Sequence, residues 1–227
     1  LTISEMKEKI QKEKLTEITI PSSVTSIERT AFYSCSSLTQ ITIPSSVTSI
    51  ESNPFRECSL LKQIVVDSSN THFAFINGVL FNKDTQSIIC CLQNKKGTYD
   101  IPSSVTSIGD YAFSHCCLLT QIKVPPSVTS IGNGAFDQCS SLTKMTIPSS
   151  VTSIKKCTFS ECSALAQIVI PSSVTSIGCK AFYKCSSLTR ITIPSSVASI
   201  GNKAFTNTKL SDTVKEQLVA KYGPNAF

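Results

Sequence analysis

Apolar and polar residues follow a pattern along this chain that returns every 23 residues. One copy reads LTQITIPSSVTSIESNPFRECSL, in which Ile41 and Ile43 lie on one side of a strand and Thr42 on the other. Pro44 ends that strand, because proline lacks the N–H that a continued ladder would use. Each copy therefore predicts a short strand that is buried on one face and followed by a turn.

Three columns of residues keep this spacing, apart from one gap. They are the prolines Pro21, Pro44, Pro102, Pro125, Pro148, Pro171 and Pro194; the leucines Leu15, Leu38, Leu61, Leu119, Leu142, Leu165 and Leu188; and the phenylalanines Phe32, Phe55, Phe113, Phe136, Phe159, Phe182 and Phe205. A fixed period in this range is the signature of stacked coils, in which each coil contacts only its neighbours. We expect a repeat solenoid, a right-handed coil with parallel β ladders whose internal columns run without interruption.

The remainder of each copy predicts a second, weaker ladder and a convex turn. Val47 and Ile50 place two more apolar residues inward through the short extended stretch VTSI. In the segment DYAFSHC, Phe113 and Cys116 are spaced i and i+3, which puts them on one face of a helical turn. We therefore expect a single α or 3₁₀ turn on the convex side of each coil.

One coil is longer than the others. From Asp67, which fills a proline slot, to Pro102 the spacing is 35 residues, one period plus 12. The runs GVLF and SIIC are apolar and strand-like, and the NKDTQ between them is typical of a hairpin connection. The sequence predicts one β-hairpin insertion at about 67–101.

Both ends depart from the repeat and resemble caps. Within SEMKEKIQKEKL, Ser4 is a candidate N-cap and Met6 and Ile10 share one helix face. The i,i+4 spacing also predicts ion pairs of Glu5 with Lys9 and Glu8 with Lys12. We expect residues 1–14 to cover the first coil of a solenoid that spans 15–208, the weaker of the two caps.

A second helix is expected over residues 212–222, within a C-terminal cap at 209–227. Ser211 precedes it as N-cap, and Gly223 with Pro224 forms a stop signal. One face carries Val214, Leu218 and Tyr222. Such ends are needed because a bare terminal coil would expose apolar surface and an unpaired strand edge.

The pattern LxxIxIPxxVxxIgxxAFxxC resembles that of the BspA-like, or Treponema-type, leucine-rich repeats over roughly residues 15–208. The long coil FINGVLFNKDTQSIICCLQNKKGTYDIP is also similar to an insertion that recurs in that family. The resemblance implies a surface adhesin or interaction protein of the kind found in host-associated bacteria and parasitic protozoa. It implies no catalytic residues.

Six of the 11 cysteines form a column of their own, each three residues after a column phenylalanine: Cys35, Cys58, Cys116, Cys139, Cys162 and Cys185. A free cysteine behaves as a small buried hydrophobe, and stacked side chains that point the same way suit a disulfide torsion badly. We expect buried free thiols here. The others, Cys90, Cys91, Cys117, Cys157 and Cys179, match no zinc spacing, so no metal or cofactor is expected.

Charge is uneven along the chain. Residues 1–117 carry 10 Lys and Arg against 11 Asp and Glu, whereas residues 118–227 carry 11 against 4. A basic half favours acidic partners such as sulfated sugars, but no dense basic run with interleaved aromatics is present, and nucleic acid is not the expected ligand.

No apolar run is long enough to predict a membrane span, and the first residues lack the apolar centre of a signal peptide.

Candidate chemistry is sparse. His72 and His115 have no recurring carboxylate or cysteine partner in the sequence, and a nucleophile at Cys116 or Cys117 beside His115 conflicts with the column position of Cys116. No nucleophile elbow or phosphate-binding loop is present, so we expect no enzyme and no catalytic residues. Ice binding needs paired threonine columns, and only one broken column exists. The serines are assigned to turn chemistry after proline.

The outward strand positions vary while the inward ones do not, which favours recognition on a concave face. The candidate partner-binding residues are Gln40, Thr42, Gln63, Val65, Gln121, Lys123, Lys144, Thr146, Gln167, Val169, Arg190 and Thr192. We expect a non-catalytic protein- or glycan-binding adhesion module, cell-surface or secreted, with extracellular matrix or a host-cell surface as partner. The alternative is a scaffold that self-assembles without an outside ligand, and weak homodimers are expected at high concentration.

Overall fold

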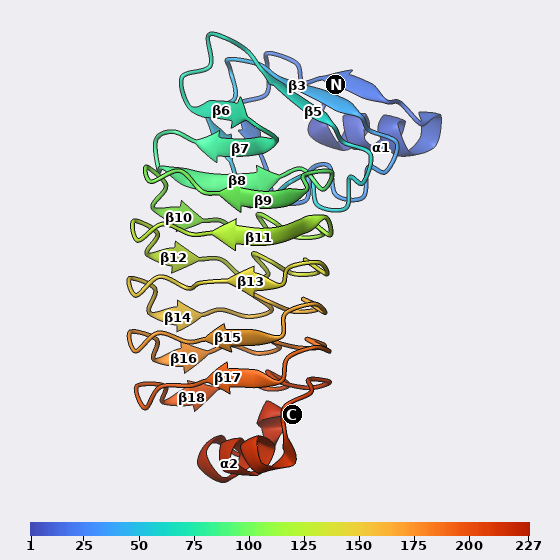
Figure 1. Ribbon diagram of the computed structural model, residues 1–227. Coiled ribbons are helices and arrows are strands. Elements are labelled where there is room, and N and C mark those ends of the chain that lie inside the picture. Colours follow the sequence, from blue (N-terminus) through green and yellow to red (C-terminus); the bar gives the residue numbers. More distant parts are fainter.

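A computed structural model describes all 227 residues as short stacked coils with a helix at each end (Figure 1). The first ladder comprises β1 (Glu17–Thr19), β3 (Gln40–Ile43), β5 (Gln63–Val66), β9 (Gly97–Asp100), β11 (Leu119–Lys123), β13 (Lys144–Met145), β15 (Gln167–Val169) and β17 (Arg190–Thr192). The second comprises β2 (Ser26–Ile27), β4 (Ser49–Ile50), β8 (Ser87–Cys91), β10 (Ser107–Ile108), β12 (Ser130–Ile131), β14 (Ser153–Ile154), β16 (Ser176–Ile177) and β18 (Ser199–Ile200). The remaining elements are α1 (Ile3–Glu13), β6 (Phe73–Ile76), β7 (Val79–Asn82), α2 (Asp212–Tyr222) and a 3₁₀ helix (Pro224–Ala226).

The expected solenoid with two parallel ladders is confirmed. In the first ladder Ile41 pairs with Ile64, and in the second Ser107 pairs with Ser130, so both keep the 23-residue register. The inward strand residues of the first ladder are buried almost throughout, and the residues between them face outward.

The convex segments are hydrogen-bonded turns, and none of them forms an α or 3₁₀ helix. The Cys139 N–H donates to the Phe136 carbonyl (3.1 Å), which is the expected i+3 contact. The Phe136 and Gln138 N–H groups instead donate to the next coil, at the carbonyls of Thr158 (2.9 Å) and Ser160 (2.8 Å). The residue before each column cysteine is left-handed, with φ of 58° at Gln138. In this conformation every second N–H group of the turn points along the stack axis and donates to the next coil. These bonds between coils stand where a helical turn was expected.

Two columns of small residues bond each coil to the one before it. The Ser150 hydroxyl donates to the Val128 carbonyl (2.6 Å), and Ser46, Ser127, Ser173 and Ser196 do the same in their coils. The Cys139 thiol donates to the Phe113 carbonyl (3.1 Å), with equivalent bonds from Cys58, Cys162 and Cys185. In these five coils the serine two residues after the column proline therefore bonds between coils, beyond the local turn role expected of it.

The phenylalanine column stacks its rings along the axis. From Phe113 to Phe205 successive ring centroids lie 5.3 to 5.5 Å apart with interplanar angles of 21° or less. Phe227, outside the repeat, adds a tilted ring 5.9 Å from Phe205 and closes the column at the C-terminal end.

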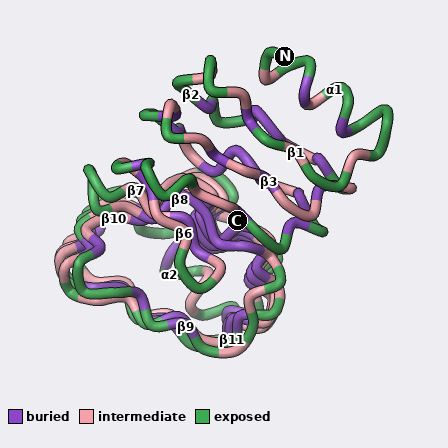
Figure 2. Tube along the Cα trace, turned by 90° about the horizontal axis from the view of Figure 1, so that it is seen from above, coloured by how far each residue is buried: buried purple, intermediate pink, exposed green.

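The columns are interrupted at the insertion, and the expectation of continuous internal ladders is wrong there. β5 pairs only with β3, β4 only with β2, and the buried hydrophobic residues fall into one core of 21 and another of 39. We call residues 1–66 the N-terminal stack and residues 97–227 the C-terminal stack. Figure 2 shows the N-terminal stack displaced sideways from the outline of the C-terminal coils.

The insertion forms the wall between the two cores. The predicted hairpin is confirmed as β7 paired antiparallel with β8, and β8 joins the second ladder beside β10. Because successive side chains of a strand point to opposite faces, Val79 and Ile88 belong to the C-terminal core whereas Leu80 and Ile89 belong to the N-terminal core. One two-sided sheet thus closes both stacks.

β6 is a third strand of this wall that the sequence reading missed. It pairs antiparallel with β7 through the two-residue turn Asn77-Gly78, where both residues have positive φ, 50° and 80°. Asn-Gly between apolar runs is the typical type I′ hairpin signal. It was available in the sequence and would have identified β6.

The N-terminal helix starts earlier than expected. Thr2 is the N-cap, in a capping box with Glu5, and Ser4 lies inside the helix. The Glu8–Lys12 ion pair is present, whereas Glu5 accepts from the Thr2 N–H and forms no ion pair with Lys9. Met6 and Ile10 are fully buried on the first coil, as expected.

The C-terminal helix spans Asp212–Tyr222 with Ser211 as N-cap and Gly223 as C-cap, in agreement with the prediction. Leu218 is buried, and the Tyr222 hydroxyl donates to the Val197 carbonyl (3.0 Å). The helix therefore covers the last coil by both apolar contact and a hydrogen bond.

Candidate binding faces

The first ladder of the C-terminal stack presents the outward residues of β11, β13, β15 and β17 in parallel rows. These eight residues form what we call the outward face: Gln121, Lys123, Lys144, Thr146, Gln167, Val169, Arg190 and Thr192. All but the partly exposed Gln121 are exposed, while Ile122, Met145 and Ile168 between them are buried. Since strand alternation separates the two sets, the inner residues fix the position of the outer ones.

The other four predicted residues lie on a different surface. Gln40 and Thr42 on β3 and Gln63 and Val65 on β5 belong to the N-terminal stack, whose ladder is not continuous with the outward face. The structure therefore divides the twelve predicted residues into a group of four and a group of eight, and they do not form one long face.

Positive charge on the outward face is only partly neutralised. Lys123 Nζ lies 3.1 Å from Asp100 Oδ2 on the neighbouring strand β9. No carboxylate lies within ion-pair distance of Lys144 or Arg190. Gln167 stands in register between these two cations, and Val169, at 66% exposure, adds an apolar contact point in the neighbouring row beside Thr192. The face thus combines two free cations, amide and hydroxyl groups and one apolar contact point.

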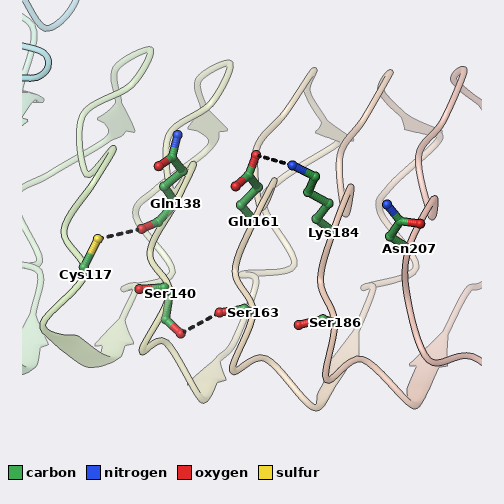
Figure 3. A pocket seen from close by; sticks show the side chains of 8 residues that line it. All are labelled: Cys117, Gln138, Ser140, Glu161, Ser163, Lys184, Ser186 and Asn207. Atoms are coloured by element: carbon green, nitrogen blue, oxygen red, sulfur yellow. Dashed lines mark hydrogen bonds and ion pairs between the residues drawn. The ribbon is translucent and has the colours of Figure 1, made fainter.

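A polar groove of about 420 Å³ runs across the turns of the C-terminal stack (Figure 3). Lys184 Nζ lies 3.5 Å from Glu161 Oε1, and the Ser163 hydroxyl donates to the Ser140 carbonyl (3.2 Å). The groove is lined by Cys117, Gln138, Ser140, Glu161, Ser163, Lys184, Ser186 and Asn207. The sequence reading missed this groove, although its members stand one residue before or after the cysteine column and keep the 23-residue period.

The junction of the two stacks holds a cluster of aromatic and charged groups. The Arg56 guanidinium lies 4.1 Å from the Tyr111 ring centroid and 5.9 Å from that of Tyr33. Its Nη2 is 3.9 Å from Asp137 Oδ2, and its buried Nε has no partner. The Asn53 amide donates to the Tyr111 carbonyl (2.8 Å) and links coils 58 residues apart. A cavity of about 320 Å³ opens beside this cluster.

Two carboxyl groups near the junction have shifted pKa values. Burial raises the pKa of Asp137, and the hydrogen bond from Ser160 and the charge of Arg56 lower it only in part. Burial also acts to raise the pKa of Glu57, but the hydroxyls of Tyr33 and Ser34, each 2.8 Å away, outweigh it and the pKa ends below its usual range. The Glu57 shift arises within the N-terminal stack, whereas Asp137 of the C-terminal stack also feels the charge of Arg56 across the junction.

The histidines acquire partners that the sequence did not reveal, but no reactive arrangement. His72 Nδ1 lies 2.5 Å from Asp84 Oδ2 on the insertion. His115 Nδ1 lies 2.8 Å from the hydroxyl of Ser114, which is only 1% exposed and closed to a substrate. No group of three His, Cys, Asp or Glu residues is placed to hold a metal ion.

The column thiols are all buried and free, as expected. Burial raises the pKa of Cys185 to about 12 and that of Cys139 and Cys162 well above the usual value. The thiolate is the reactive form, and burial disfavours it at these three positions, whereas a hydrogen bond with Cys58 lowers the pKa of Cys35. The surface of the C-terminal stack carries rows of polar and basic side chains.

Comparison with known proteins agrees with this geometry. The model of the BspA type leucine rich repeat region matches in six copies, over residues 7–95 and 90–211. Among solved structures, a leucine rich cell surface protein from Faecalibacterium prausnitzii is 32% identical with a TM-score of 0.83, covering 97% of this chain and 66% of its own. A search of curated proteins finds no match.

Two further structures share the fold. The pneumococcal vaccine antigen PcpA is 25% identical with a TM-score of 0.71, covering 88% of this chain and 58% of that one. The leucine rich repeat protein of T. pallidum is 25% identical with a TM-score of 0.54, covering 91% and 83%. The chain thus spans less than two thirds of the length of the F. prausnitzii protein and of PcpA. Neither helix of this chain is long and apolar enough to cross a bilayer.

Proposed function

We propose that this chain, which belongs to the BspA-type leucine-rich repeat family, is a non-catalytic adhesion module that binds a protein or glycan through the outward face of its C-terminal stack. The family is one of repeat proteins that bind other proteins, and the F. prausnitzii relative is a cell surface protein. Because of this relative, we also propose that the chain is a cell-surface or secreted protein. Its proposed partner is extracellular matrix or a host-cell surface.

The observation that carries this proposal is the pair of free cations on a rigid face. Lys144 and Arg190 are exposed and lack ion-pair partners, and the inner residues beside them, the buried Met145 and the partly buried Ile191, belong to or pack on the C-terminal core. Their side chains are therefore available to an acidic partner without first breaking an internal salt bridge. Because the face is long and no deep pocket dominates it, affinity is spread over many weak contacts.

The test is a binding screen against extracellular matrix proteins, glycans and host-cell surfaces, followed by charge reversal. The double variant Lys144→Glu, Arg190→Glu is expected to weaken a hit and to remove its dependence on ionic strength, since exposed charges are screened by salt. The matched control is Lys156→Glu, Lys203→Glu, which makes the same charge change on exposed convex residues. It is expected to leave binding nearly unchanged.

Three results would contradict the proposal. Equal loss in both double variants would show that only net charge matters, and a hit that maps to the insertion at 67–101 would place the site elsewhere. Absence of any outside ligand, together with self-association in sedimentation, would favour the scaffold alternative. Gln40, Thr42, Gln63 and Val65 form a separate surface in this proposal, and alanine at these four is expected to have less effect than alanine on the outward face.

A further inference from the structure

The interruption of the first ladder leaves one edge of β5 without a neighbouring strand. In this ladder the Gln63 N–H donates to the Thr39 carbonyl (3.2 Å) and the Asp67 N–H to the Ile43 carbonyl (2.9 Å). Main-chain groups of alternate residues in a parallel strand point to opposite neighbours. Those of Ile64 and Val66 therefore point away from β3, and β5 pairs with no other strand.

The chain that should cover this edge has been diverted. One repeat period after Ile64 and Val66 come Ser87 and Ile89, which in an uninterrupted solenoid would form the next strand of the first ladder. They lie instead in β8 of the second ladder, where Ser87 pairs with Ser107. The next first-ladder strand, β9, pairs only with β11. No strand therefore lies beside the free edge of β5, although β3 and β1 follow in regular order on its other edge.

A groove of about 390 Å³ occupies this place. It is lined on one side by β5 residues, including Ile64 and Val66, and on the other by Phe73 and Phe75 of β6 and by Lys83. Apolar side chains of both strands belong to or pack on the N-terminal core. The groove therefore offers unpaired main-chain donors and acceptors beside strands whose inner side chains pack on the N-terminal core.

The corner that closes the groove is fixed by hydrogen bonds. Asn70 stands one period after the buried Val47, is itself 4% exposed, and donates to the Pro44 and Val47 carbonyls (2.9 and 3.0 Å). Its amide oxygen accepts from the N–H groups of His72 and Phe73. The positions of β5 and β6 are consequently set before any ligand arrives, which lowers the entropic cost of binding.

We propose that the open edge of β5 binds an extended peptide segment of a partner protein by strand addition. The peptide takes the place of the missing first-ladder strand, in continuity with β1, β3 and β5. Main-chain hydrogen bonds to Ile64 and Val66 supply affinity, and alternate apolar side chains of the peptide face the N-terminal core. This site is separate from the outward face and does not depend on it.

A single extended segment fits this place better than a second folded copy of the chain. In a copy of the chain, the free edge of β1 belongs to the whole N-terminal stack. The other open first-ladder edge, β9, carries the whole C-terminal stack with it. β6 lines the groove together with β5, which favours a single extended strand over the edge of a whole stack. Sedimentation distinguishes the two occupants.

The probe is a labelled synthetic peptide LTRITIP, which copies residues 188–194, one of the chain's own first-ladder strands. The control peptide has proline in place of the arginine and of the second threonine, because the main-chain groups of Arg190 and Thr192 face the preceding coil in β17, so it cannot donate to β5 at those positions. We expect LTRITIP to slow amide hydrogen exchange at Ile64 and Val66, and the control peptide to have no effect. Failure of LTRITIP to bind, or protection elsewhere without these two amides, would refute the proposal.

The matched variants separate the main chain from the side chain. Val66→Pro removes the N–H that points to the groove, at an edge position where proline is tolerated, and is expected to weaken LTRITIP binding about tenfold. Val66→Ala keeps the N–H and is expected to change affinity by less than about threefold. Equal affinities of the two variants, or a dimer whose formation depends on the Val66 N–H, would overturn the inference. Circular dichroism checks that Val66→Pro is folded, and the exchange experiment tests the proposal on the unaltered chain in any case.

Discussion

Removal of one ring from the phenylalanine column provides a quantitative test of how the coils are held together. Phe136 is fully buried and stacks on Phe113 and Phe159 at centroid distances of 5.4 and 5.5 Å. Truncation of a buried phenylalanine to alanine costs about 3 to 5 kcal/mol through lost burial and the cavity left behind. Each stacked pair is worth about 0.5 to 1.5 kcal/mol beyond burial, so Phe136→Ala belongs near the upper end of that range.

The assay is urea unfolding of the wild type and variants, followed by both fluorescence and circular dichroism. The surface control is Gln121→Ala, which is expected to lower the free energy of unfolding by less than about 0.5 kcal/mol. Phe55→Ala is an intermediate case, because its ring stacks only on Phe32, at 5.7 Å, and is 4% exposed. Equal destabilisation by Phe136→Ala and Gln121→Ala would show that inward and outward columns have been exchanged.

Double variants extend the test to the division between the two stacks. Phe136 and Phe159 share a stacked pair, so their combined truncation should deviate from additivity by at least about 0.5 kcal/mol. Phe32 and Phe136 belong to different cores, and their effects should add within about 0.5 kcal/mol. Strong coupling between Phe32 and Phe136 would refute the interpretation of the insertion as a wall between two cores.

Three further outcomes are expected. In the native chain a thiol reagent should modify only the three partly exposed cysteines, with the eight buried ones reacting after unfolding; mass spectrometry that finds bridges in the cysteine column would contradict this. Because the folded pKa of Asp137 is raised, its stability contribution is present below the unfolded pKa and is lost as pH rises through the folded pKa; relative to Asp137→Asn, the wild type should therefore gain stability as pH falls from 7 to below about 4, as measured by unfolding at each pH. Asn53→Ala should cost about 1 to 3 kcal/mol by removing the buried amide that bonds Tyr111, and an unchanged melting curve would show that this contact does not join the stacks.

The sequence by itself was sufficient for the coils. Residues that repeat every 23 positions must occupy equivalent places in a stack, and each coil packs only on its neighbours, so the pattern predicts strand register, the buried cysteines and the outward positions without long-range information. The C-terminal helix was equally predictable, because Ser211 and Gly223 are local signals. The N-cap was misplaced by two residues because Thr2 and Ser4 are both good N-caps, and only the Glu5 contact distinguishes them.

The tertiary structure decided where the insertion goes and, with it, the shape of the binding surfaces. The runs GVLF and SIIC predict a hairpin, but their pattern does not say whether it projects from the stack or replaces part of a ladder. β8 joins the second ladder, and its apolar residues on both faces serve two cores. This placement separates Gln63 from Gln121, brings Arg56 onto Tyr111 and opens the edge of β5. These contacts join residues that no period relates, so they depend on pairing choices that only the folded chain makes.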